Sequence, residues 1–289
     1  MDVYQIVTDK IINLLEQGTI PWKKPWVSAN GFPKNLISNK EYRGINLFLL
    51  GCQQYSSQYW LTYKQATEKK GFIRKGEKSS LVIFYKMFDK QSEDEKDTGK
   101  IPMLRYYNLF NLDQCENIPS PTTEVPTYKF TPIERAEQII KDMPNRPPIS
   151  YGGSKAAYSP VTDSIKIPNE DRFEKSEEMY SVLYHELAHA TGHQSRLGRK
   201  EVIEYNRFGS DPYANEELVA ELTSSMLCGV AGISNETIDL AASYLDGWLS
   251  VLKKDKRMIL VAAAQAQKAA DYILNRKGGE EEVTEDQAA

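Results

Sequence analysis

The sequence is poor in the residues that build covalent or metal-bound scaffolds, with only three cysteines and three histidines among 289 residues. Cys52, Cys115 and Cys228 are far apart, which excludes a cysteine-rich metal site and a dense disulfide framework. Their odd, sparse number predicts free thiols in a reducing cytoplasm. An apolar run of about 18 residues, the length of a membrane helix, is missing, and so is a secretory signal. We therefore expect a cytoplasmic protein without a membrane partner.

Charge is unevenly distributed, although the formal net charge is only −4. Residues 1–88 hold 13 Lys and Arg against 6 Asp and Glu, whereas the remaining residues hold 23 against 34. A basic front and an acidic back favour two domains with different partners, the first partner being a polyanion. A hydrophobic content of 40% and a charged content of 26% are those of a globular protein.

Composition also divides the chain into four parts. Residues 118–130 contain a Pro- and Thr-rich run that is typical of a linker. This run separates a domain of residues 1–117 from a second domain of residues 131–276. Residues 277–289 form an acidic tail, for which we expect disorder. The expected fold class is α+β, with an N-terminal α+β domain and a second domain that combines helices with a small edge sheet.

Apolar periodicity predicts the main elements. Helices are expected at residues 2–17, 45–54, 132–143, 215–228, 235–252 and 256–275, with a further helix capped by Thr62. Alternating patterns predict strands at 80–86 and 105–112 around a polar loop at 89–100, short strands at 149–152 and 156–158, and a hairpin within 161–168.

All three histidines lie in the segment Tyr184–His193, which contains the motif HExxH. Residues four apart share a helix face, so His185 and His189 can direct both imidazoles to one metal ion. Glu186 follows the first histidine, where its carboxylate can reach a metal-bound water and act as a general base. The alternative is a surface helix with incidental histidines, and the acidic helix downstream counts against it.

A catalytic zinc site usually takes three protein ligands, so a third side chain is needed. His193 is one candidate, although the long metzincin pattern requires a histidine at the position of Ser195. Glu217 is the favoured candidate, because acids on a largely apolar helix need a cation. Glu221 shares its face and would accept a hydrogen bond from a ligand histidine, with Glu216 as the alternative for either role. The expected cofactor is Zn²⁺ or another divalent metal such as Mn²⁺.

The same acids allow a second interpretation, an exposed acidic helix start whose negative charges interact favourably with the helix dipole, and for Glu216 this interpretation has at least equal weight. If the site cleaves a protein or peptide substrate, Glu186 would pass a proton from water to the leaving amine. Tyr213 or Tyr205 could supply an oxyanion donor, packing being the default role of each. An HExxH motif can also hold a metal that is only structural.

Aromatic and basic residues alternate in the front half, a pattern that suits single-stranded nucleic acid. Cations follow the phosphates, while aromatic faces stack on bases at roughly 1–3 kcal/mol each. Composition alone is weak support, because tryptophans usually pack in cores. Trp22 and Trp26 lie between prolines, where we expect poor core packing. By chemistry, the candidate DNA contacts are Lys23, Trp26, Arg43, Lys64 and Arg74.

Together, these motifs resemble the ArdC-type antirestriction family of conjugative plasmids and mobile elements. The segments that carry the resemblance are Gly18–Trp26, Tyr42–Asn46, Trp60–Gln65, Arg74–Lys78, His185–His193 and Glu216–Glu221. The resemblance extends to about residue 275. It implies a single-stranded DNA-binding first domain, a zincin-like metallopeptidase second domain, and protection of incoming DNA from host restriction.

Overall fold

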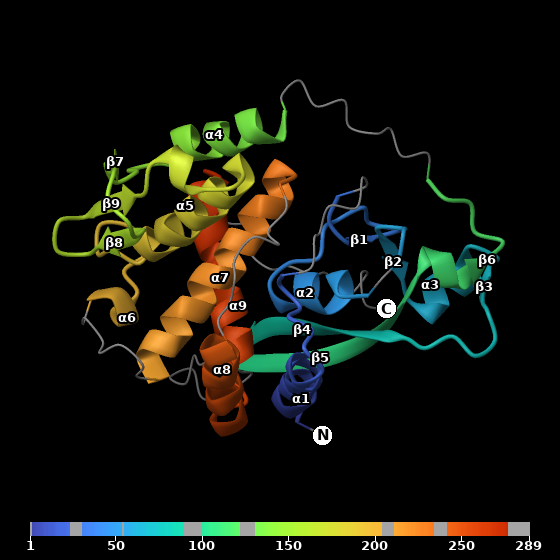
Figure 1. Cartoon of the computed structure of the whole chain (residues 1–289). Coiled ribbons are helices and arrows are strands. Elements are labelled where there is room, and N and C mark those ends of the chain that lie inside the picture. Colours follow the sequence, from blue (N-terminus) through green and yellow to red (C-terminus); the bar gives the residue numbers. More distant parts are fainter. Residues whose placement is uncertain are drawn as a thin grey trace. The chain divides into compact units, whose positions relative to one another are not determined.

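The structure is a computed structural model that describes residues 2–23, 31–53, 55–89, 100–121, 131–203, 211–233 and 242–276. The chain divides into two compact units, whose elements are labelled in Figure 1. The first unit contains Phe32–Thr123 and the first residues of the chain, and the second contains Val7–Gly31 and Glu124–Gly278. Both units combine helices with strands, which confirms the predicted α+β class.

The first unit is built on a four-stranded sheet in the order β1-β2-β5-β4. Its strands are β1 (Lys34–Asn35), β2 (Tyr59–Leu61), β4 (Ser80–Asp89) and β5 (Lys100–Asn111). Helix α2 (Ile45–Gly51) packs on β4. The Asn46 side chain accepts from the Ile83 N–H and donates to the Ile83 carbonyl, both at 2.7 Å. These bonds satisfy the backbone of an edge strand and anchor the helix to the sheet.

Helix α3 (Tyr63–Glu68) begins at Thr62, as predicted. Thr62 Oγ1 accepts from the Gln65 N–H at 3.1 Å, and the Thr62 N–H donates to Gln65 Oε1 at 2.9 Å, which forms a capping box. The helix packs on β3 (Phe72–Ile73), which pairs with β6 (Cys115–Glu116) after the short helix η1 (Leu112–Gln114). The core of the unit includes Tyr42, Leu50, Trp60, Val82 and Leu109.

The second unit is mainly helical. Its helices are α1 (Val3–Glu16), α4 (Pro132–Asp142), α5 (Ser176–Thr191), α6 (Lys200–Ile203), α7 (Asp211–Ala231), α8 (Ala242–Lys254) and α9 (Met258–Ile273), with the short helix η2 (Glu170–Arg172) before α5. Helix α7 packs on both α5 and α9 (Figure 1). Leu218 and Leu222 of α7 are fully buried there. None of the described helices combines the length and apolar content that a membrane span requires.

A three-stranded sheet in the order β7-β9-β8 completes the second unit. Strand β7 (Ile149–Tyr151) is parallel to β9 (Ser164–Ile167), and β8 (Ala157–Ser159) is antiparallel to it. The hairpin predicted within residues 161–168 is therefore wrong, because β9 pairs with β8 through a turn at residues 160–163. Pro160 is the first residue of this turn and Asp163 adopts a φ of 45°. Residues 161–163 therefore form the turn and are not the first strand of a hairpin. Strand β8 is an edge of this sheet and packs beside α5.

Helix α1 belongs to the second unit for most of its length, whereas its position in the sequence predicts that it belongs to a domain of residues 1–117. Its apolar face is buried, and Thr8 Oγ1 donates to the Lys256 carbonyl at 2.8 Å. Glu16 forms an ion pair of 2.7 Å with Lys253. Helical periodicity identified the buried face correctly, but it carries no information on which part of the chain covers that face. Residues 122–130 and 277–289, expected to be linker and tail, lie outside the described residues.

Trp22 is a core residue of the second unit, contrary to the expectation of poor packing between prolines. It is 1% exposed, and its ring centre lies 5.4 Å from that of Trp248 in an edge-to-face arrangement. Its carbonyl accepts a 2.6 Å hydrogen bond from Ser225 Oγ on α7. Trp60 is equally buried in the first unit. Neither of these indoles can therefore stack on a nucleic acid base in this conformation.

We expect Trp22→Ala to lower the free energy of unfolding by about 3–5 kcal/mol, because it removes a fully buried aromatic side chain. Urea denaturation followed by circular dichroism measures this change. The control is Tyr63→Ala, whose side chain is 65% exposed and whose loss should change stability by less than about 0.5 kcal/mol. A Trp22→Ala variant with unchanged stability would contradict the core assignment.

Candidate metal centre

The HExxH residues lie on α5, and the acidic residues that face them lie on α7. His185 Nε2 and His189 Nε2 are 3.0 Å apart. Glu217 Oε2 is 3.4 Å from His185 Nε2, and Glu217 Oε1 is 3.6 Å from His189 Nε2. One ligand atom from each of the three residues therefore lies within 4.8 Å of the others. In the part of the chain that the structure describes, no other group of three or more His, Cys, Asp or Glu residues is arranged in this way.

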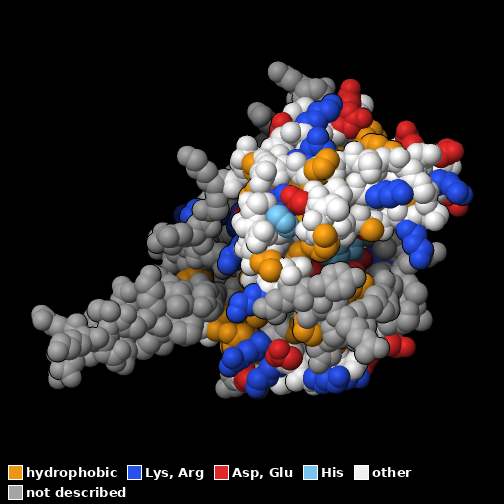
Figure 2. All heavy atoms as spheres, turned by 90° about the vertical axis from the view of Figure 1, so that its left-hand side faces the viewer, with side chains coloured by type: hydrophobic (Ala, Val, Ile, Leu, Met, Phe, Trp, Pro, Cys, Tyr) orange, Lys and Arg blue, Asp and Glu red, His pale blue; other side chains and the backbone are white. Residues whose placement is uncertain are grey.

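This donor set fits a divalent metal ion. Two imidazole nitrogens and one carboxylate oxygen are the protein ligands found in catalytic zinc sites of the glutamate type. The three side chains are 13–16% exposed, so they are held by their surroundings while a path to solvent remains. Figure 2 shows histidine and acidic side chains meeting in a recess on one face of the molecule. A cation between the three ligand atoms would compensate the buried carboxylate.

Each imidazole also has a carboxylate beside its Nδ1 atom. Glu216 Oε1 is 3.1 Å from His189 Nδ1, and Glu221 Oε1 is 3.5 Å from His185 Nδ1. A carboxylate at Nδ1 keeps the proton there and leaves the Nε2 lone pair for a metal. The interpretation of Glu216 as an exposed helix start is wrong, because α7 begins at Asp211 and Glu216 is 6% exposed. The structure thus places both Glu216 and Glu221 where the sequence predicts a supporting carboxylate.

The cluster shifts the pKa values of its own members. Burial lowers the pKa of His185, but its hydrogen bond with Glu217 and the charges of Glu221, Glu217 and Glu186 raise it to about 9. Burial raises the pKa of Glu217, but hydrogen bonds from His185 and Tyr213, together with nearby imidazole charge, lower it to about 2. The site therefore keeps Glu217 ionised, and a metal must displace a proton from His185 to bind.

Glu186 is placed by the edge strand of the small sheet. Its carboxylate Oε2 accepts the backbone N–H of Tyr158 in β8 at 2.7 Å. The residue is 8% exposed and follows His185 directly on α5. The strand thus fixes the carboxylate that the sequence predicts to be a general base. The contact comes from a backbone N–H of a distant segment, so no local sequence motif predicts it.

His193, the other candidate for the third ligand, lies outside the cluster. Its Nδ1 accepts the Ser195 N–H at 3.2 Å and is 2.8 Å from Ser195 Oγ. Asp163, which also binds the Arg196 guanidinium, lies 3.9 Å from the same nitrogen. Helix α5 ends at Thr191, so the chain turns away from the His185 face before His193.

Arg199 is a residue of this site that the sequence analysis missed. Its guanidinium binds Glu216 at 2.6 and 2.8 Å and is buried between α5 and α7. These contacts hold the pKa of Glu216 below its ordinary value although burial acts in the opposite direction. Arg199 comes from the loop after α5, where no periodicity applies. The only signal in the sequence was that buried acids require a cation.

Of the candidate DNA contacts, Lys23 lies in the second unit and Trp26 lies outside the described residues. The positive charge of Lys23 acts on Glu221, whose pKa is nevertheless raised because burial dominates. Lys23 therefore belongs to the unit that carries the metal-site candidates. Tyr205, one candidate oxyanion donor, also lies outside the described residues, whereas Tyr213 donates to Glu217.

The other three candidates lie in the first unit. Arg43 is half-buried before α2, and Lys64 is exposed on α3. Arg74 is exposed and binds Glu77 Oε1 through Nε at 3.1 Å and Nη2 at 2.7 Å. Both nitrogens of this ion pair bind the same Glu77 oxygen, so the charge of Arg74 is already neutralised, whereas Lys64 is exposed on α3.

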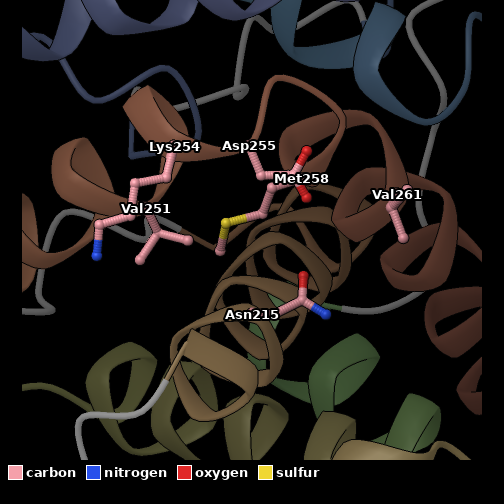
Figure 3. A pocket seen from close by; sticks show the side chains of 6 residues that line it. All are labelled: Asn215, Val251, Lys254, Asp255, Met258 and Val261. Carbon is pink, nitrogen blue, oxygen red and sulfur yellow. The ribbon is translucent and has the colours of Figure 1, made fainter.

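A pocket of about 260 Å³ lies on the face of α7 that is turned toward α8 and α9. Its lining, drawn in Figure 3, is Asn215, Val251, Lys254, Asp255, Met258 and Val261. Asn215 precedes Glu217 by two residues, a rotation of about 200° around the helix. The pocket is therefore not a recess of the metal-site candidates, none of which lines it.

Both halves of the chain match domains of known protein families. Residues 1–110 match the N-terminal domain of the anti-restriction factor ArdC, and residues 134–265 match a zincin-like metallopeptidase domain. The metal-free crystal structure of the antirestriction ArdC protein from plasmid R388 is similar at 35% identity, with a TM-score of 0.77 over 96% of this chain and 100% of that one. Its Mn(II)-bound structure is similar at 37% identity and a TM-score of 0.75, over 95% and 98% of the two chains.

Two curated relatives extend the comparison. The uncharacterized protein y4eC of Sinorhizobium fredii is 35% identical, over 94% of this chain and 91% of its own length. A DNA primase TraC of Escherichia coli is 33% identical over 94% of this chain, which spans only 27% of that relative. The zincin-like domain and the Mn(II)-bound relative support a divalent metal. Two domains in the same order, and similarity over nearly the full length of the solved structures, show that the chain belongs to the ArdC-type antirestriction protein family.

Proposed function

We propose that this protein binds single-stranded DNA through its first unit, carries one divalent metal, expected to be zinc, in its second unit, and protects incoming DNA of a mobile element from host restriction in the cytoplasm. The observation that carries this proposal is the convergence of His185, His189 and Glu217 in a chain that is similar over nearly its full length to an antirestriction protein. The test is the transfer of unmodified DNA into restricting and non-restricting hosts, with and without the protein. Equal recovery in the restricting host with and without the protein would contradict the proposal.

The second unit supplies the groups for metal-dependent chemistry. His185, His189 and Glu217 would hold the ion, which supplies Lewis-acid polarisation of a bound water and of a substrate carbonyl. Glu216 and Glu221 orient the imidazoles through the Nδ1 atoms of His189 and His185. Glu186 takes the water proton on its carboxylate and delivers it to the leaving group.

Peptide hydrolysis is a second candidate function, and the position of β8 favours it. This strand is an edge of its sheet, and its Tyr158 N–H binds the Glu186 carboxylate. An edge strand can pair with an extended peptide through its backbone, which would bring the peptide bond to the general base. Under this hypothesis, DNA binding serves to localise the peptidase.

The described surface of the first unit offers a basic and aromatic patch for DNA, formed by α3 and the segment between it and β4. We call it the α3 patch and define it by the exposed residues Tyr63, Lys64, Lys69, Lys70, Phe72, Lys75 and Lys78, beside which Glu68 and the paired Arg74 are also exposed. Tyr63 is 65% exposed and Phe72 is 48% exposed, unlike the buried Trp60. Exposed rings beside lysines provide base stacking and phosphate neutralisation together.

We expect Lys64→Glu with Lys75→Glu to weaken single-stranded DNA binding at low salt, because attraction of two phosphates is replaced by repulsion. The slope of log affinity against log salt should also become less steep, by about 0.7 for each phosphate that the protein no longer neutralises. Fluorescence anisotropy over a salt series measures both effects. Lys155→Glu with Lys268→Glu is the control, since this pair makes the same charge change at two exposed lysines of the second unit. Equal losses in both proteins would assign the effect to net charge and contradict the α3 patch.

A further inference from the structure

Arg199 lies behind the metal-site candidates, with a side chain that is only 4% exposed. Its Nε donates to Glu216 Oε2 at 2.8 Å, and its Nη2 donates to Glu216 Oε1 at 2.6 Å. These two parallel bonds form the fork geometry that a guanidinium provides and an ammonium cannot. Both oxygens of the Glu216 carboxylate are therefore fixed in direction.

The same guanidinium is held from the other side by α5. Nη1 donates to Thr191 Oγ1 and Nη2 donates to the Ala188 carbonyl, both at 2.7 Å. The Arg199 backbone N–H donates to the Gly192 carbonyl at 2.9 Å, so the loop itself is bound to the end of α5. A Cβ atom at Gly192 would clash with Val202 Cγ2 and lie 3.0 Å from Arg199 Nη2, so this glycine leaves room for both side chains. Arg199 thus bridges the two helices that carry the ligands.

This arrangement has a consequence for His189. An ionised carboxylate only accepts hydrogen bonds, so Glu216 Oε1 pairs with His189 Nδ1 at 3.1 Å when that nitrogen carries the proton. The neutral imidazole then has its lone pair on Nε2, the atom that lies 3.0 Å from His185 Nε2 and 3.6 Å from Glu217. Rotation of the Glu216 carboxylate would release the imidazole and allow the other tautomer.

We propose that Arg199 is a positioning residue of the metal site, which fixes Glu216 and thereby holds His189 in the tautomer and orientation that bind metal. The inference rests on the proposed metal site. Because Arg199 binds Glu216 and not a proposed ligand, its loss should weaken metal binding without removing a ligand. Interactions of this kind change metal affinity by about 10–100-fold.

The test is Arg199→Lys, which keeps the charge but loses the bidentate geometry. Competition with a chromophoric chelator should show zinc affinity at least about tenfold lower than that of the wild type. Nitrogen-15 spectra of the metal-free protein should show His189 protonated on Nδ1 in the wild type and a mixture of tautomers in the variant. The chain has only three histidines, so each imidazole can be assigned by substitution. The control is Arg135→Lys, an arginine of the same unit whose Nε donates to the Ala231 carbonyl at 2.8 Å.

A double-mutant cycle separates positioning from general stability. In a Glu216→Gln background, Arg199→Lys should change zinc affinity little further, because the two residues act in series. Wild-type zinc affinity in a folded Arg199→Lys protein would overturn the inference, and so would an equal loss in Arg135→Lys. Should Arg199→Lys fail to fold, the zinc affinity of Glu216→Gln is the deciding measurement. A zinc affinity of Glu216→Gln equal to that of the wild type would overturn the inference.

The failure of this inference is distinguishable from failure of the metal site. Retention of zinc by His189→Ala would overturn the metal site itself. Loss of zinc from His189→Ala together with normal binding by Arg199→Lys would leave the site intact and overturn only the role of Arg199.

Discussion

Stable metal binding should be lost in Glu217→Ala and retained in His193→Ala. Glu217 brings its carboxylate to 3.4 Å from His185 Nε2 and 3.6 Å from His189 Nε2, whereas His193 is engaged with Ser195. Removal of Glu217 from the three proposed ligands would leave a two-histidine site, which holds zinc poorly. We expect purified Glu217→Ala to contain less than about a tenth of the wild-type metal after dialysis. Substitution of a residue that only supports a ligand already lowers metal affinity by about 10–100-fold, and loss of a ligand should have at least this effect.

Elemental analysis of the two proteins, with circular dichroism to verify folding, provides the measurement. Glu217→Gln is a milder companion variant, since it keeps the side-chain volume and removes the charge. The reverse pattern, with metal lost from His193→Ala and kept by Glu217→Ala, would contradict the ligand assignment.

Glu186→Gln should keep the metal and the DNA affinity but abolish any peptide hydrolysis. The amide keeps an oxygen that can accept the Tyr158 N–H, while it cannot take a proton from water. Loss of a general base typically lowers a rate by about 10²–10⁴-fold. The assay follows cleavage of a casein-type substrate and of DNA-bound proteins, with zinc content and single-stranded DNA affinity measured in parallel.

Glu177→Gln, on the first turn of α5, is the matched control, because it removes a carboxylate from the same helix far from the cluster. Protection from restriction then separates the two candidate functions. If protection survives in Glu186→Gln, the protein acts by binding DNA, and hydrolysis is not its means of protection. If protection is lost while metal and DNA binding persist, the result supports the peptidase hypothesis. It also excludes a mechanism in which DNA binding alone protects the DNA.

Much of the site could be predicted from the sequence because helical spacing is local information. The positions of His185, His189, Glu217 and Glu221 on two helix faces follow from intervals of four residues. The Thr62 cap and the apolar faces of α4 and α5 follow from equally local rules. These rules say which side chains share a face.

The remainder depends on contacts between distant segments. Trp22 is read locally as a proline-flanked exposed ring, yet Trp248 and Ser225 bury it. Arg199 follows a helix-ending glycine in a loop, so only the fold shows that it reaches Glu216. The β8–β9 pairing was missed because alternation over a few residues does not identify the partner strand.

Anomalous diffraction from crystals grown with zinc tests the central claim most directly. A peak is expected about 2.0–2.2 Å from the Nε2 atoms of His185 and His189 and from a Glu217 carboxylate oxygen. The same peak should be absent from crystals of Glu217→Ala. A zinc peak bonded to His193, or zinc bound elsewhere while the cluster stays without a peak, would contradict the account.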